Sequence, residues 1–70
     1  MRLSEGQVNS TYMVSKIDAE ESGMEEFLFT LGCYPGEPVT IISHLKNNMI
    51  ITVKDARYSI DSALAHAICV

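Results

Sequence analysis

The segment from Gly32 to Val39 marks an abrupt change from helix-type to strand-type sequence. Gly32 follows a short helical stretch at the place where helices often end in a left-handed residue, a conformation that costs a residue with a Cβ roughly 1 kcal/mol or more. Pro35 and Gly36 suit the centre of a tight turn, because proline presets φ and glycine accepts positive φ. We therefore expect a helix to end at Leu31 and a strand to begin at Val39.

The size and charge of the chain limit what it can do. Seventy residues make one domain, residues 1–70, with a small core and little room for an active-site cavity. Nine acidic residues oppose five basic ones, and the net charge of −4 repels phosphate backbones, which disfavours nucleic acid and favours basic partners. We find neither a leader-like segment nor an apolar run of about 18 residues, so we expect a soluble cytoplasmic protein without membrane insertion.

The residue pattern predicts a mainly β fold. Val8–Ile17 is expected to form the first strand, with Leu3 covering one end of the core. Ser22 and Glu25 fit a capping box, which predicts a helix from Ser22 to Leu31. The next two strands, Val39–Leu45 and Met49–Lys54, are expected to form a hairpin, because Asn47 and Asn48 in its turn readily accept positive φ. A strand at Arg57–Ile60, a helical turn capped by Asp61 and a closing strand at Ile68–Val70 are expected to follow. Five short strands in tight succession predict a small antiparallel barrel that closes on itself.

Periodicity alone assigns one face of the short helix to the core. Spacing at i, i+3, i+4 and i+7 collects Met24, Phe27, Leu28 and Leu31, and leaves Phe29 exposed.

Residues able to bind a metal or to catalyse a reaction are present without a diagnostic arrangement. The metal candidates are Cys33, His44, His66, Cys69 and the acids of residues 18–26. Their spacing indicates no site, and the acids are explained as a solvated face near a helix start. We interpret the two distant cysteines as free thiols, and we expect no cofactor. No nucleophile elbow, phosphate loop or zinc-protease motif occurs, which favours a protein that is not an enzyme.

The chain resembles the FeoA family, the small cytosolic component of bacterial ferrous iron transport. The resemblance rests on Val14–Ile17, on Leu28–Gly32 followed by Pro35-Gly36 and Val39–Ile42, and on Tyr58–Ile60 with Ala65, Ile68 and Val70. It implies an SH3-like β-barrel in which Leu28, Phe29 and Leu31 point inward and Phe27 outward. We adopt this placement over the periodic one, because so short a helix samples too few turns for periodicity to decide.

The same resemblance implies an interaction module that docks on a FeoB-type membrane GTPase and transporter of ferrous iron. The residues expected to contact this partner are Glu25, Glu26, Phe27, Leu31, Cys33, Tyr34 and Pro35. One alternative is a metal-regulatory module like the C-terminal domains of iron-dependent repressors. Another is a protein that binds Fe²⁺ or another divalent metal directly and weakly. An open strand edge would also permit a weak homodimer.

Overall fold

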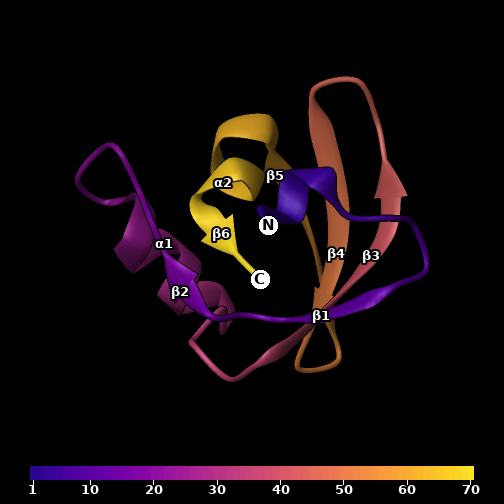
Figure 1. Cartoon of the computed structure of the whole chain (residues 1–70), viewed down its shortest axis with the longest axis horizontal. Coiled ribbons are helices and arrows are strands. Elements are labelled where there is room, and N and C mark those ends of the chain that lie inside the picture. Colours follow the sequence, from indigo (N-terminus) through magenta and orange to yellow (C-terminus); the bar gives the residue numbers. More distant parts are fainter.

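The computed structural model describes residues 1–70 and contains six strands, two α-helices and one 3₁₀ helix. Figure 1 shows these elements wrapped around a common interior. In chain order they are η1 (Leu3–Glu5), β1 (Thr11–Met13), β2 (Lys16–Ile17), α1 (Met24–Leu31), β3 (Pro38–His44), β4 (Asn48–Val53), β5 (Ala56–Asp61), α2 (Ser62–Ala67) and β6 (Ile68–Cys69). The predicted mainly β class is confirmed, with one strand more than the five expected.

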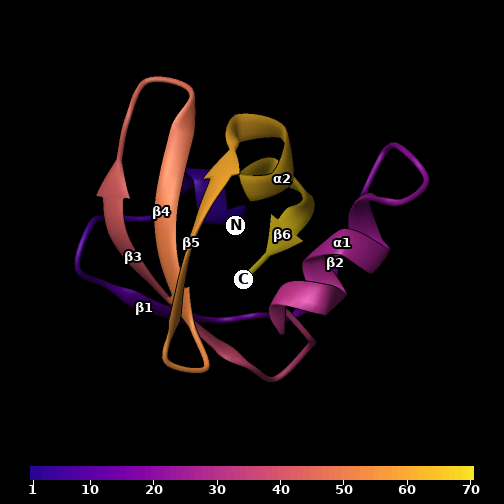
Figure 2. The same ribbon diagram turned by 180° about the vertical axis from the view of Figure 1, so that it is seen from behind.

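The strands form two antiparallel sheets. The larger has the order β1-β3-β4-β5, and the smaller pairs β2 with β6. The expected closure of the sheet on itself is wrong, because β5 pairs only with β4 and the chain continues into α2 before it reaches β6. Figure 2 shows β5 at the end of the larger sheet with α2 and β6 beside it.

The first expected strand is divided between the two sheets. Val8 lies in a turn and is exposed, and Asn9 adopts a positive φ of 68°. The chain changes sheets at Val14 and Ser15, whose backbone N–H groups donate to Glu37 and Cys69. A single strand over Val8–Ile17 is therefore wrong, since no one neighbour offers hydrogen bonds along the whole segment.

Helix α1 starts later than the capping-box pattern predicts. Gly23 is its N-cap with φ of 93°, and no side chain caps the helix, so Ser22 and Glu25 form no capping box. The end is as predicted: Gly32 has φ of 100°, its N–H donates to Phe29, and the N–H of Cys33 donates to Leu28. These two bonds satisfy carbonyls that the last helical turn leaves free.

The turns that connect the strands combine confirmed and wrong predictions. Gly36 has φ of 91°, and Glu37 N–H donates to Tyr34, as the Pro35-Gly36 pattern predicted. The β3–β4 hairpin is confirmed, but positive φ at Asn47 and Asn48 is wrong, because the loop is closed instead by Leu45 N–H donating to Asn48. The β4–β5 turn does use two left-handed residues, Lys54 and Asp55.

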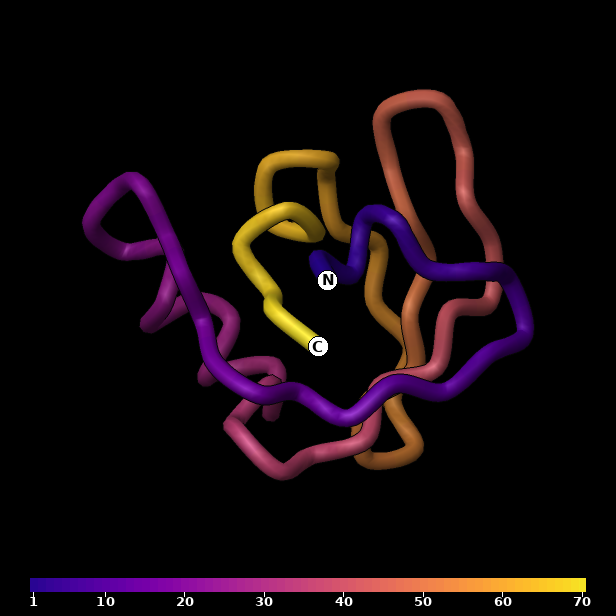
Figure 3. Tube along the Cα trace, viewed as in Figure 1, coloured from indigo at the N-terminus to yellow at the C-terminus, as the bar shows by residue number.

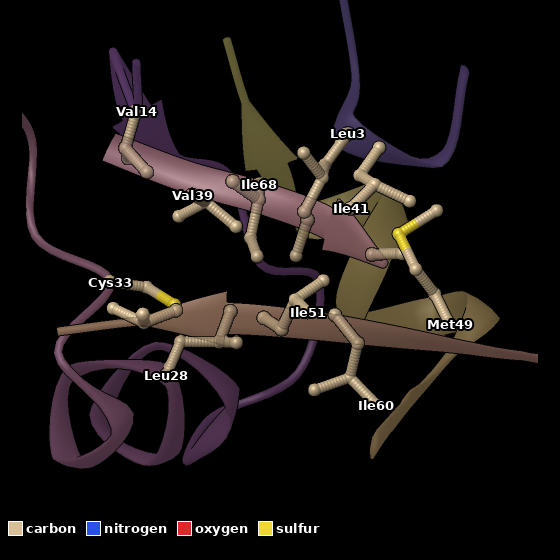
Figure 4. Packing of buried hydrophobic residues seen from close by; sticks show 13 residues of the cluster. Leu3, Val14, Leu28, Cys33, Val39, Ile41, Met49, Ile51, Ile60 and Ile68 are labelled. Atoms are coloured by element: carbon tan, nitrogen blue, oxygen red, sulfur yellow. The ribbon is translucent and has the colours of Figure 1, made fainter. Parts of the chain in front are cut away.

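The core lies between the two sheets and the helices. Thirteen buried residues from every part of the chain form one hydrophobic cluster, and they include Leu3, as predicted. Figure 4 shows Leu28 of α1 and Ile68 of β6 directed into the same interior as Ile51 of β4. No polar or charged residue is buried. Because Leu28 is buried in this cluster, the side of α1 that carries Leu28 faces the core.

Helix α2 is secured by the cap that the sequence predicts. The Asp61 carboxylate accepts a hydrogen bond of 2.9 Å from Leu64 N–H. The helix runs for six residues, longer than the single turn expected, and contacts α1, β5 and η1. This places Ala63 and Leu64 beside α1.

The two ends of the chain lie together. Val70 N–H donates to Met1, and Arg2 bridges to Cys69 in an antiparallel pair. Figure 3 shows both ends close to each other near the middle of the trace. Arg2 also binds Asp18 at 2.9 Å and the His66 carbonyl at 3.1 Å, which ties the segment before α1 to α2. The hydrogen bond to Asp18 raises the pKa of Arg2.

Candidate functional site: the two flanks of helix α1

Helix α1 divides the predicted partner residues between two flanks. Successive helical residues are rotated by about 100°, so Phe27 and Phe29 lie about 200° apart when measured through buried Leu28 on the core side, and about 160° apart across the exposed side. Met24 and Leu31 stand three and four residues from Phe27 and share its flank. Glu25 stands four residues from Phe29 and shares the other. The seven predicted residues therefore do not form one continuous patch.

The Phe27 flank borders an open groove between α1 and α2. Phe27 is 48% exposed. The groove has a volume of about 460 Å³, and its apolar lining residues are Met24, Phe27, Ala63 and Leu64. The outward placement of Phe27 that we adopted is confirmed, and the placement given by periodicity alone is wrong for this residue.

The Phe29 flank continues into the turn after the helix. Phe29 is half-buried and stacks on Tyr34, with ring centroids 4.8 Å apart and planes 16° apart. Tyr34 and Pro35 are both exposed. The predicted inward placement of Phe29 is therefore only partly correct. Its ring is covered by Tyr34 at the surface and lies outside the core cluster.

Cys33 and Leu31 contribute less surface than a contact residue needs. The Cys33 side chain belongs to the core and has no exposed area. Desolvation by burial raises the pKa of its thiol to about 11, so the neutral thiol is the form present at neutral pH. Leu31 is half-buried against the core. We therefore keep Leu31 at the edge of the candidate surface and leave Cys33 beneath it.

The surface around the start of α1 is predominantly negative. The sequence contains no lysine or arginine between Lys16 and Lys46, while five acids lie between Asp18 and Glu26. Only two ion pairs form in the molecule, Arg2 with Asp18 and Lys54 with Glu37. The carboxylates of Glu20, Glu21, Glu25, Glu26 and Asp61 therefore have no cationic partner within the chain.

The candidate metal ligands do not converge. No three His, Cys, Asp or Glu side chains come together in a way that could hold a metal ion. His44 is exposed at the end of β3, and His66 is exposed on α2, where it lines a second depression with Asp18, Glu20 and Glu21. Cys33 and Cys69 are free and buried, as expected. The thiol of Cys33, desolvated and neutral, is a poor ligand because metals bind the thiolate.

The sequence predicted a shallow apolar groove beside the short helix, bordered by loops, and did not predict that a second helix forms its other wall. Its second wall comes from Ala63 and Leu64, which the sequence placed only in a helical turn before the last strand. Leu64 was the available signal: it is a large apolar residue in a short, capped helix whose neighbours are small. The packing of α2 against α1 joins residues nearly forty positions apart, and periodicity within one helix carries no information about such a contact.

Neither helix has the length and hydrophobicity required to cross a bilayer.

Two solved structures of FeoA proteins have the same fold as this chain. FeoA of Stenotrophomonas maltophilia in complex with zinc, described as a procaryotic SH3 domain protein and suggested as a ferrous iron transport activating factor, is 19% identical, with a TM-score of 0.89 over 99% of this chain and 87% of that chain. An iron uptake regulatory protein, also FeoA, is 22% identical, with a TM-score of 0.85 over 97% and 91%. The SH3-like fold is therefore confirmed.

A longer protein contains a similar domain. IdeR of T. acidophilum is 28% identical, with a TM-score of 0.85 over 97% of this chain and 32% of that chain. This chain thus corresponds to about a third of IdeR.

The family model gives the most direct assignment. No curated protein matches the chain. The model of the FeoA domain, by contrast, matches residues 1–70 from end to end. The chain therefore belongs to the FeoA domain family.

Proposed function

We propose that this chain is a cytoplasmic, non-enzymatic accessory module of a ferrous iron uptake system, and that it docks on a FeoB-type membrane GTPase and transporter through helix α1. Membership of the FeoA family supports the link to iron transport. The observation that carries the docking role is Phe27, an aromatic residue 48% exposed on a helix whose other large apolar residues are at least half-buried. Exposed aromatic side chains beside a groove are favoured contacts at protein interfaces.

An interaction role accords with the rest of the surface. Every buried side-chain nitrogen or oxygen has a hydrogen-bond partner, and no charged group is buried. Catalytic acids and bases are usually desolvated by burial, which shifts their pKa values, and this chain buries no charged group. The depressions are instead open and shallow, and they suit contact with a partner.

Co-purification tests this proposal. The tagged cytosolic GTPase domain of a FeoB-type transporter from the same genome should retain the full chain, in at least one of its GDP-bound and GTP-analogue-bound states. An unrelated GTPase domain with the same tag controls for nonspecific retention. Absence of retention in both nucleotide states would contradict the docking role.

The similarity to IdeR favours one second candidate, a metal-regulatory module. Titration with Fe²⁺, Mn²⁺ and Zn²⁺ separates the two. A regulator that senses metal directly should bind one of these ions stoichiometrically, and changes at His44 or His66 should abolish the binding. For a docking module we expect weak binding or none.

A further inference from the structure

We propose that the groove between α1 and α2 recognises a positively charged protein segment that inserts an aliphatic side chain between Phe27 and Leu64. This inference deepens the proposed function, on which it rests, by naming the chemistry of the segment that docks. It also selects one flank of α1, because Phe29 and Tyr34 of the other flank line no depression.

The floor of the groove suits an aliphatic side chain. Met24 and Leu64 are half-buried against the core, and Phe27 is exposed above them. A partner side chain placed here would complete the burial of all three. Burial of apolar surface on both partners favours association, and this site would therefore be the dominant apolar contact.

The rim of the groove suits basic residues. Glu21 and Asp61 both line it, and neither has a cationic partner in the chain. One Asp61 oxygen caps α2, and the other remains available. Glu25 and Glu26 of the first turn of α1 add to the same negative field. Lysine or arginine on either side of the inserted residue would therefore meet complementary charge.

The groove continues along α2 into a second depression, so an extended segment of a partner protein could lie across both. A second depression of about 470 Å³ shares Glu21, Met24 and Ala63 with it and adds Asp18, Glu20 and His66. Both depressions are thus parts of one path along α2, with acids on the side of residues 18–21. An extended chain of several residues is the shape that this path accommodates. The carboxylates of Glu20, Glu21 and Asp61, which have no cationic partner in the chain, would repel acidic segments and nucleic acid phosphates.

Binding of short peptides to the full chain tests the inference. The probe is acetyl-Lys-Arg-Leu-Leu-Arg-Lys-amide, and its controls replace Leu-Leu by Ser-Ser or all four basic residues by acidic ones. NMR should show shifts at the methyl groups of Met24, Ala63 and Leu64, and both controls should bind at least about tenfold more weakly. Equal binding of the Ser-Ser peptide, or shifts confined to Phe29 and Tyr34, would overturn the inference.

Two pairs of matched variants locate the contact. Phe27→Ala should weaken binding of the probe about tenfold, while Tyr34→Ala, which removes an exposed aromatic ring from the other flank, should leave it unchanged. Glu21→Gln should weaken binding more than Glu25→Gln, although each removes one charge. Asp61→Asn keeps a capping side chain and should also weaken binding, because asparagine caps helices about as well as aspartate. Equal effects within both pairs would contradict the assignment of the groove.

The peptide experiment and the co-purification experiment fail independently. Retention by the GTPase domain that is lost in Tyr34→Ala and kept in Phe27→Ala would overturn both the groove and the contact through Phe27 of helix α1, and would leave only the choice of partner intact. Probe binding at the groove without retention by the GTPase domain would support the groove and contradict the choice of partner.

Discussion

Phe29 stacks on Tyr34 across the end of α1, with ring centroids 4.8 Å apart and planes inclined by 16°. In the sequence between these two residues, the helix ends with Gly32 as its C-cap, and the backbone then turns toward Pro35. The stack therefore links the last turn of the helix to the turn that starts β3. It covers the flank of α1 opposite Phe27.

Loss of this stack should lower stability by a measurable amount. Tyr34→Ala should reduce the free energy of unfolding by about 0.5–1.5 kcal/mol beyond the loss of buried area, because stacked aromatic pairs contribute on that scale. Urea denaturation of the wild type, both single alanine variants and the Phe29→Ala/Tyr34→Ala double variant measures the coupling. Additive effects of the two changes would show that the rings do not stabilise each other.

The left-handed end of the helix should tolerate no side chain. Gly32→Ala should lower the free energy of unfolding by more than the roughly 1–2 kcal/mol expected for positive φ alone, because its Cβ would lie 3.1 Å from Lys54 Cδ and 3.3 Å from Val53 Cγ1. Gly36→Ala is the matched control, since Gly36 also has positive φ but nothing lies within 4 Å. If Gly36→Ala proves as costly as Gly32→Ala, the packing of Lys54 over Gly32 contributes nothing.

The cap of α2 should be separable from the charge of Asp61. Asp61→Ala should lower the free energy of unfolding by about 1 kcal/mol through loss of the hydrogen bond to Leu64 N–H, whereas Asp61→Asn should lower it much less. Thermal unfolding followed by circular dichroism measures both. A destabilisation in Asp61→Asn as large as in Asp61→Ala would mean that charge, and not capping, secures the helix.

Burial of Cys33 predicts a loss of stability in alkaline solution. Its pKa is raised from 9.0 to about 11, so the unfolded chain releases the thiol proton first as the pH rises. The stabilisation is complete below pH 9 and is lost as the pH increases toward 11. Cys33→Ala should therefore show a shallower fall in unfolding free energy between pH 8.5 and 11, measured by urea denaturation. Identical pH profiles for the two proteins would contradict this.

The local signals that predicted the fold correctly are those satisfied by a few neighbouring atoms. Gly32, the Pro35-Gly36 turn and the Asp61 cap depend only on φ or on a hydrogen bond within four residues, and all three are confirmed. The predicted capping box at Ser22 is wrong, because Gly23 is the N-cap in a left-handed conformation, and the capping-box pattern takes no account of such a cap.

The features that the sequence could not predict depend on distant parts of the chain. Val14 and Ser15 change sheets because their N–H groups find acceptors at Glu37 and Cys69. The groove exists because Leu64 of α2 lies beside Met24 and Phe27 of α1. Neither arrangement leaves a periodic trace in the local sequence. The outward position of Phe27 was predicted only through the family resemblance, since helical periodicity favoured the opposite.

The affinity of the full chain for the cytosolic domain of a FeoB-type transporter tests the central claim most directly, when the wild type is compared with Phe27→Ala and Leu45→Ala. Leu45 is 55% exposed in the β3–β4 loop, which lies on the opposite side of the molecule from α1 (Figures 1 and 2). Phe27→Ala should weaken binding about tenfold or more, and Leu45→Ala should bind as the wild type does. Unchanged affinity in Phe27→Ala, or an equal loss in Leu45→Ala, would contradict docking through helix α1.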